Sequence, residues 1–106
     1  MSNYKVDRQK WAQMTIFEQM GNIYSEVGRS FAAKIQGDTE RSKQASYRAI
    51  DLFDATVDVL IASNPNRSKE VLRSKDQYLS ALLGNNLDDM RSIDNYFLQY
   101  AIAARR

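Results

Sequence analysis

The positions of glycine and proline constrain the fold of this chain more than any other feature. Its 106 residues include four glycines and one proline, and most of these fall in three short breaks. The breaks are Gly37-Asp38, Asn64-Pro65 and Gly84-Asn85-Asn86. Each contains residues typical of helix ends, which stop one helix or cap the next. The breaks therefore divide the chain into four long segments.

Each segment carries apolar residues spaced three and four apart, which is the period of an amphipathic helix. Long helices joined by short links favour an up-down arrangement. We therefore predict an all-α fold: an up-down four-helix bundle with a short N-terminal arm or helical turn. We expect a single domain over residues 1–106, with the arm at 1–14 and helices at about 16–36, 39–63, 65–83 and 88–104.

The ends of the first helix are the best defined by the sequence. Thr15 and Glu18 have the spacing of a capping box, in which each side chain bonds the other residue's backbone amide. At the other end, Gly37-Asp38 leaves so short a connection that the next helix must fold back antiparallel. This hairpin predicts that Glu26 lies near Arg48.

The chain contains neither cysteine nor histidine, which excludes their use as nucleophiles, general bases or zinc ligands. We expect no enzymatic activity, no catalytic or metal-binding residue, no cofactor and no small-molecule substrate. The first residues form no apolar run typical of a signal peptide. No stretch approaches the roughly 20 apolar residues of a membrane-spanning helix. We expect a cytoplasmic protein with no membrane partner.

A stripe of small residues follows one side of the first helix: Gly21, Ser25, Gly28 and Ala32. A glycine within a helix costs about 1 kcal/mol relative to alanine, and close approach of another helix offsets that cost. The approaching helix belongs either to the same chain or to a second copy, which would make the stripe an interface for self-association.

The last helix ends in a run that is apolar on nearly every side, from Tyr96 to Ala104. A single buried face leaves Tyr96, Leu98 and Ile102 on other sides of the helix. Large exposed apolar patches usually mark binding surfaces, so these residues predict a homo-oligomer. The alternative is that the N-terminal arm, with Tyr4 and Trp11, covers them.

Three aspartates recur on one face of the second helix, at Asp51, Asp54 and Asp58. Such spacing is similar to the magnesium sites of all-α nucleotide pyrophosphatases, but the paired glutamates that those sites also need are missing. We favour an interhelical ladder of ion pairs with basic residues of the third helix, namely Lys69, Arg73 and Lys75.

Basic residues gather in the arm and in the second and third helices, and the formal net charge is +2. RNA or DNA is a candidate partner, since phosphate contact needs such side chains on one surface. Tyr4, Trp11 and Tyr47 could stack on bases. Acidic residues interrupt most of the clusters, which favours a mixed surface. The candidate contacts are Lys5, Arg8, Lys10, Arg41, Lys43, Arg67, Lys69 and Arg73.

Several runs resemble a group of small, uncharacterised bacterial helical-bundle proteins. They are Glu18-Gln19-Met20-Gly21-Asn22-Ile23, Ser25-Glu26-Val27-Gly28-Arg29, Gly37-Asp38 and Arg48-Ala49-Ile50-Asp51-Leu52. This resemblance implies no particular activity. The architecture is more distantly similar to the four-helix proteins of ribosomal intervening sequences and to the retroelement accessory variability protein. That likeness implies a ring-forming oligomer associated with nucleic-acid machinery.

Two hypotheses for function follow from these features. The first is a non-enzymatic helical-bundle interaction protein, acting as a homo-oligomeric scaffold or adaptor. The alternative is a nucleic-acid-binding accessory subunit of a bacterial ribonucleoprotein or retroelement-type system.

Overall fold

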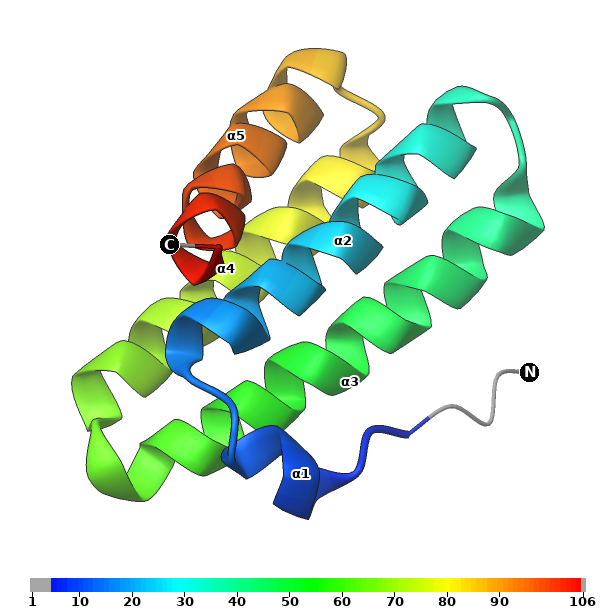
Figure 1. Ribbon diagram of the computed structural model, residues 1–106. Helices are drawn as coiled ribbons and strands as arrows, with labels where there is room; N and C mark the ends of the chain where they lie inside the picture. The colour runs from blue at the N-terminus through cyan, green and yellow to red at the C-terminus, as the bar shows by residue number, and fades with distance from the viewer. Residues whose placement is uncertain (1–4, 106) are drawn as a thin grey trace.

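A computed structural model describes residues 5–105 of the chain and confirms the expected all-α fold. Over these residues it contains five helices and no strand (Figure 1). They are α1 (Arg8–Ala12), α2 (Ile16–Ile35), α3 (Thr39–Ser63), α4 (Pro65–Gly84) and α5 (Leu87–Ala104). The molecule measures 39 × 29 × 25 Å.

The four long helices begin and end within one residue of the expected positions. The capping box at Thr15 and Glu18 is present, with the two side-chain-to-amide bonds at 3.0 and 3.1 Å. The turn between α4 and α5 is formed by an asparagine in the left-handed conformation. Gly84 is the last residue of α4, and it is Asn85 that adopts the left-handed conformation, with φ 55°. Asparagine tolerates this region better than most residues because its short side chain can bond locally.

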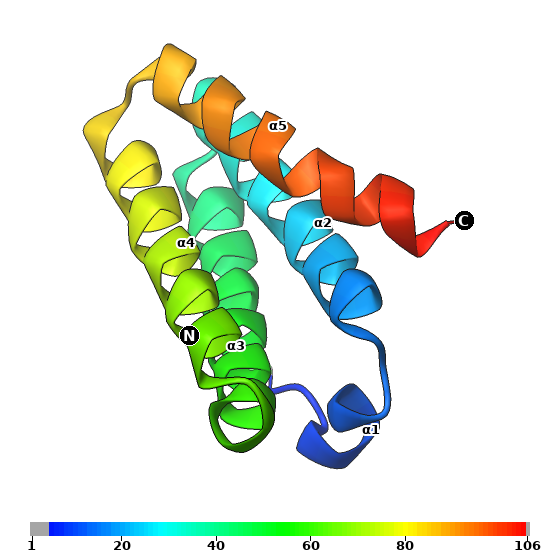
Figure 2. The same ribbon diagram turned by 90° about the vertical axis from the view of Figure 1, so that its left-hand side faces the viewer.

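The regular up-down four-helix bundle is not confirmed. α2 packs against both α3 and α5, and α3 packs against α4. Figure 2 shows α3 and α4 running side by side, whereas α5 is inclined to them and passes over α2, with its C-terminal end directed away from α4. Accordingly, α5 has its main contact with α2 and a smaller one with α4.

The N-terminal arm forms the short helix α1 and docks on α3. The Trp11 side chain is buried, and its Nε1 donates to Thr56 Oγ1 at 2.9 Å. The backbone amide of Val6 donates to Asp51 Oδ2 at 2.7 Å. From α2, Gln19 Nε2 donates to the Trp11 carbonyl at 2.8 Å and ties the α1–α2 connection down. These contacts tie residues 6–14 to the core, in which Trp11 is buried.

Aromatic rings from four helices form the centre of the core. Ring centroids are 5.4 Å apart for Phe31 and Tyr78, 5.9 Å for Tyr78 and Phe53, and 5.7 Å for Phe53 and Phe97. The Ser30 hydroxyl donates to the Val27 carbonyl at 2.8 Å. Because that proton is used, the Tyr78 hydroxyl must be the donor in its 2.6 Å bond to Ser30. Burial raises the pKa of Tyr78 to about 12, so the donor keeps its proton.

Candidate functional site

The small-residue stripe of α2 serves a contact within the chain. A Cβ placed on Gly21 would lie 3.5 Å from Ala101 Cα of α5, and one on Gly28 would lie 3.6 Å from Asp94 Oδ1. Ser25 and Ala32 are exposed beside this crossing. The geometry favours the intramolecular alternative at Gly21 and Gly28, and self-association along the stripe stays a prediction.

The three residues expected to be exposed on the last helix differ in their surroundings. Tyr96 is half-buried, and its hydroxyl lies 3.3 Å from both Glu70 Oε1 and the Tyr100 hydroxyl. Leu98 and Ile102 are exposed, at 37% and 45%. Trp11 packs against α3 instead of covering them, and Tyr4 lies outside the described residues. Only two members of the predicted patch therefore remain available to a partner.

The acidic stripe of α3 pairs with two different parts of the chain. Asp54 Oδ1 accepts from Lys75 Nζ at 2.8 Å, as the ladder hypothesis predicts. Asp51 instead pairs with Arg8 of α1 at 3.0 Å. Within residues 5–105, the ion pairs include neither Lys69 nor Arg73, so the rest of the ladder is wrong. No metal-binding group of three acidic residues was found in the same range.

The basic residues predicted to contact nucleic acid lie on separate elements. Lys5, Arg8 and Lys10 belong to the arm and α1, near the C-terminal half of α3. Arg41 and Lys43 lie in the first turns of α3, at the other end of that helix, and Arg67, Lys69 and Arg73 lie in the first half of α4. Figure 1 places α1 and the start of α3 at opposite ends of the molecule. The eight candidate residues therefore form no single continuous basic surface.

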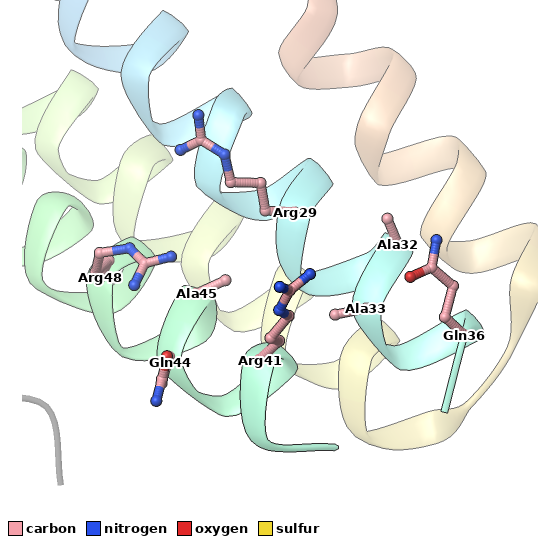
Figure 3. Close-up of a pocket in the computed structure, with 8 residues that line it drawn as sticks. All are labelled: Arg29, Ala32, Ala33, Gln36, Arg41, Gln44, Ala45 and Arg48. Atoms are coloured by element: carbon pink, nitrogen blue, oxygen red, sulfur yellow. The ribbon is translucent and has the colours of Figure 1, made fainter. Parts of the chain in front are cut away.

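A groove lined by arginines lies between α2 and α3, near the Gly37 turn. Its volume is about 370 Å³. Figure 3 shows Arg29 extending from α2, and Arg41 and Arg48 from α3, with Ala33 and Ala45 between them. The complete lining is Arg29, Ala32, Ala33, Gln36, Arg41, Gln44, Ala45 and Arg48.

Glu26 binds two of these arginines, and Asp38 lies near the third. Glu26 accepts from Arg29 Nη1 through Oε1 at 2.8 Å and from Arg48 Nε through Oε2 at 2.9 Å. The second bond confirms the pair predicted from the hairpin. Arg41 Nε lies 3.6 Å from Asp38 Oδ2, and the Arg41 side chain is 81% exposed. Among these charges, three guanidinium groups face two carboxylates.

A second groove, between α3 and α4, is mainly apolar and has a volume of about 380 Å³. It includes Leu83, which at 75% is the most exposed of the large apolar side chains described. Two lysines contribute to the lining, and one of them, Lys34, donates through Nζ to the Leu82 carbonyl near the end of α4. The lining is Lys34, Thr39, Ser42, Lys43, Ser46, Tyr47, Ile50, Leu79, Leu82 and Leu83.

Further exposed apolar side chains belong to the segments that meet at this end of the molecule, where α2 and α4 end and α5 begins (Figure 2). Ile35 is 60% exposed and Leu87 is 55% exposed, and both line a third groove between α2 and α5. Leu83 and Leu87 flank the same turn, at the end of α4 and the start of α5. Ile35, Leu83 and Leu87 together form what we call the apolar end.

Neither the arginine groove nor the apolar end was predicted as a site. A signal for the groove was present, because Arg41 and Arg48 are seven residues apart and share a helix face. The hairpin that pairs Glu26 with Arg48 also brings Arg29 to this face. The apolar end had a weaker signal, which was the presence of leucine directly beside both ends of the Gly84-Asn86 turn.

No protein-family model, curated protein or solved structure matches the chain. The resemblance to small bacterial helical proteins therefore stays a prediction. Over the described residues, no helix combines the length and apolar character needed to cross a membrane.

Proposed function

We propose that the protein is a non-enzymatic interaction protein that acts as a homo-oligomeric scaffold or adaptor. The observation that carries the proposal is the apolar α3–α4 groove, which runs into the apolar end at Leu83. An apolar surface of this kind on a small domain usually marks a binding site.

The occupant we propose for the groove is the start of α5 from a second copy. Leu87 is exposed there and is followed by two exposed carboxylates, Asp88 and Asp89. The lining of the groove includes residues of the opposite charge, Lys34 and Lys43. Leu87 would enter the apolar groove while the aspartates approach the lysines, so apolar character and charge match in the same orientation.

The position of these features supports a two-fold arrangement. Leu83 in the groove and Leu87 on α5 flank one turn. The groove and the segment that would enter the groove of a second copy therefore lie at the same end of the molecule. A two-fold axis needs one patch that is complementary to itself. Two copies meeting at their apolar ends would each insert Leu87 into the other's groove.

Sedimentation velocity over a range of protein concentrations tests the proposal. We expect reversible association of the unmodified chain and a monomer for Leu83→Lys, because a lysine there places charge in the apolar contact. Ile61→Lys is the matched control, since Ile61 is 62% exposed near the opposite end of α3. A monomer at every concentration would overturn the proposal.

Two further variants identify the surface. Changing Asp88 and Asp89 together to Lys should abolish association. Adding Lys43→Glu should restore it in part, because the charges on the two sides of the contact are then exchanged. If Ile102→Lys dissociates the oligomer and Leu83→Lys does not, the interface lies at the C-terminal end of α5 and our assignment to the apolar end is wrong.

A further inference from the structure

We propose that the arginine groove between α2 and α3 binds a terminal phosphate group, carried as a phosphate monoester. This site is separate from the surface assigned to self-association. The two grooves lie on different sides of α3, one toward α2 and the other toward α4.

The guanidinium groups supply more hydrogen-bond donors than their carboxylates use. An arginine has five N–H donors. Arg48 reaches Glu26 through Nε, which leaves its two Nη groups for a ligand. Arg29 uses one Nη in the same way. Arg41 lies near Asp38 through Nε and is 81% exposed, so its two Nη groups are also available to a ligand. Planar forks of this kind match the oxygens of phosphate.

The charge of the groove favours an anion. Three arginines are accompanied by Glu26 and Asp38, so one positive charge is left uncompensated among these groups. Glu26 has its two oxygens on two different arginines. It therefore acts as a positioning residue, which holds Arg29 and Arg48 at fixed places before a ligand arrives. Such preorganisation lowers the entropy cost of binding.

The shape of the groove limits the size and kind of ligand. Ala33 and Ala45 are buried and form the floor of the groove. Their small side chains leave space between the arginines. The amides of Gln36 and Gln44 add neutral donors to the lining. A volume of about 370 Å³ is near the lower end of the range for small-molecule sites, roughly 300–1,000 Å³. A phosphate and a small part of the molecule attached to it would fit.

The lining favours a terminal phosphate over a nucleobase or an internal phosphodiester. None of the described residues that line the groove is aromatic, so no base stacks there. A monoester carries close to two negative charges at neutral pH and has three accepting oxygens. Three guanidinium groups suit that oxygen set better than they suit a phosphodiester with a single charge.

The test is an NMR titration that follows backbone amides and arginine Nε–H signals, with paired probes. Adenosine monophosphate is compared with adenosine. A short oligonucleotide with a 5′-phosphate is compared with the same oligonucleotide ending in a hydroxyl. We expect saturable shifts at the end of α2 and the start of α3 with each phosphorylated probe and no saturation with its partner. The two pairs distinguish a free nucleotide from the end of a nucleic acid as the source of the phosphate.

Variants locate the site. Arg41→Gln should weaken binding about tenfold, equivalent to about 1.4 kcal/mol, and Arg41→Lys should weaken it less because the charge remains. Arg41 is highly exposed, so neither change threatens the fold. Arg73→Gln on α4 is the matched control and should have no effect. Equal binding of adenosine and its monophosphate, or equal loss with Arg73→Gln and Arg41→Gln, would overturn the proposal.

Discussion

Arg48 of α3 and Glu26 of α2 form an ion pair of 2.9 Å across the first helical hairpin. The carboxylate is mostly buried, with 13% of its side chain exposed, and it also binds Arg29 on its own helix. The pair therefore links helix packing to the arginine groove. It fixes two of the three guanidinium groups and leaves the third, on Arg41, to the solvent.

Replacing Glu26 with Gln should destabilise the fold modestly. The change leaves two arginines without their shared carboxylate, and we expect the free energy of unfolding to fall by about 1–2 kcal/mol. Urea denaturation measures this loss. In a double-mutant cycle with Arg48→Gln, the coupling should be about 0.5–1 kcal/mol, and strictly additive losses would contradict the pairing.

Position 21 should accept alanine but not a large side chain. A Cβ on Gly21 would meet Ala101 Cα at 3.5 Å and Ala104 Cβ at 3.9 Å, which are ordinary contacts. Gly21→Ala should therefore stabilise the protein by up to about 1 kcal/mol through helix propensity. Gly21→Leu should destabilise it by about 1–3 kcal/mol because α5 must move. Thermal unfolding measures both changes, and Ser25→Leu at the neighbouring exposed position should have little effect.

Trp11→Phe should weaken the docking of α1. The substitution removes the Nε1 donor and leaves the buried Thr56 hydroxyl without that partner. We expect a loss of about 1–3 kcal/mol in urea denaturation. Adding Thr56→Val removes the stranded hydroxyl and should recover part of the loss. If the double variant is no better than the sum of the two single changes, the hydrogen bond does not stabilise the fold.

Asp94→Asn should raise stability at neutral pH. Burial raises the pKa of the Asp94 carboxyl above its ordinary value of 3.8, so the folded chain holds this proton more tightly than the unfolded chain. The contribution of this carboxyl to the free energy of unfolding is fully present below pH 3.8 and is lost as the pH rises through the folded-state pKa. Asparagine stays neutral and avoids that loss. Because Asp94 is half-buried, solvent screening keeps the expected gain below about 1 kcal/mol.

Melting temperatures measured between acid and neutral pH check this prediction. The advantage of Asp94→Asn should shrink as the pH falls toward 3.8. An advantage that is constant over the whole range would show that the effect comes from packing and not from the charge. Asp58→Asn is a suitable control, because Asp58 is exposed on α3 and should respond little.

The helix boundaries and the Glu26–Arg48 pair were predictable because local chemistry determines them. Caps such as Thr15 and breaks such as Gly37-Asp38 act over a few residues, and a short turn fixes which residues face each other. The heptad spacing of Arg41 and Arg48, extended across the hairpin, also places Arg29 on this face.

The direction of α5 and the position of Trp11 depend on contacts between distant residues. The stripe at Gly21 and Gly28 permits close approach of any helix. The sequence alone does not say whether that helix belongs to the same chain or to a second copy. Likewise, an arm with a few large apolar side chains can cover several faces of a bundle. Trp11 packs where the Thr56 hydroxyl accepts a hydrogen bond from its Nε1. No periodicity in the sequence identifies Thr56 as that acceptor. The apolar end was missed because the exposure of Leu83 follows from how α4 packs.

Trp11 is the only tryptophan in the chain, and it sits at the contact between α1 and α3. Its intrinsic fluorescence therefore reports on one small piece of the molecule. Far-ultraviolet circular dichroism, by contrast, reports on the helices as a whole. If the emission shifts to the red at a lower denaturant concentration than the loss of the helical signal, α1 dissociates from α3 before the rest of the protein unfolds. The chain thus carries its own optical label for the order in which its parts come apart.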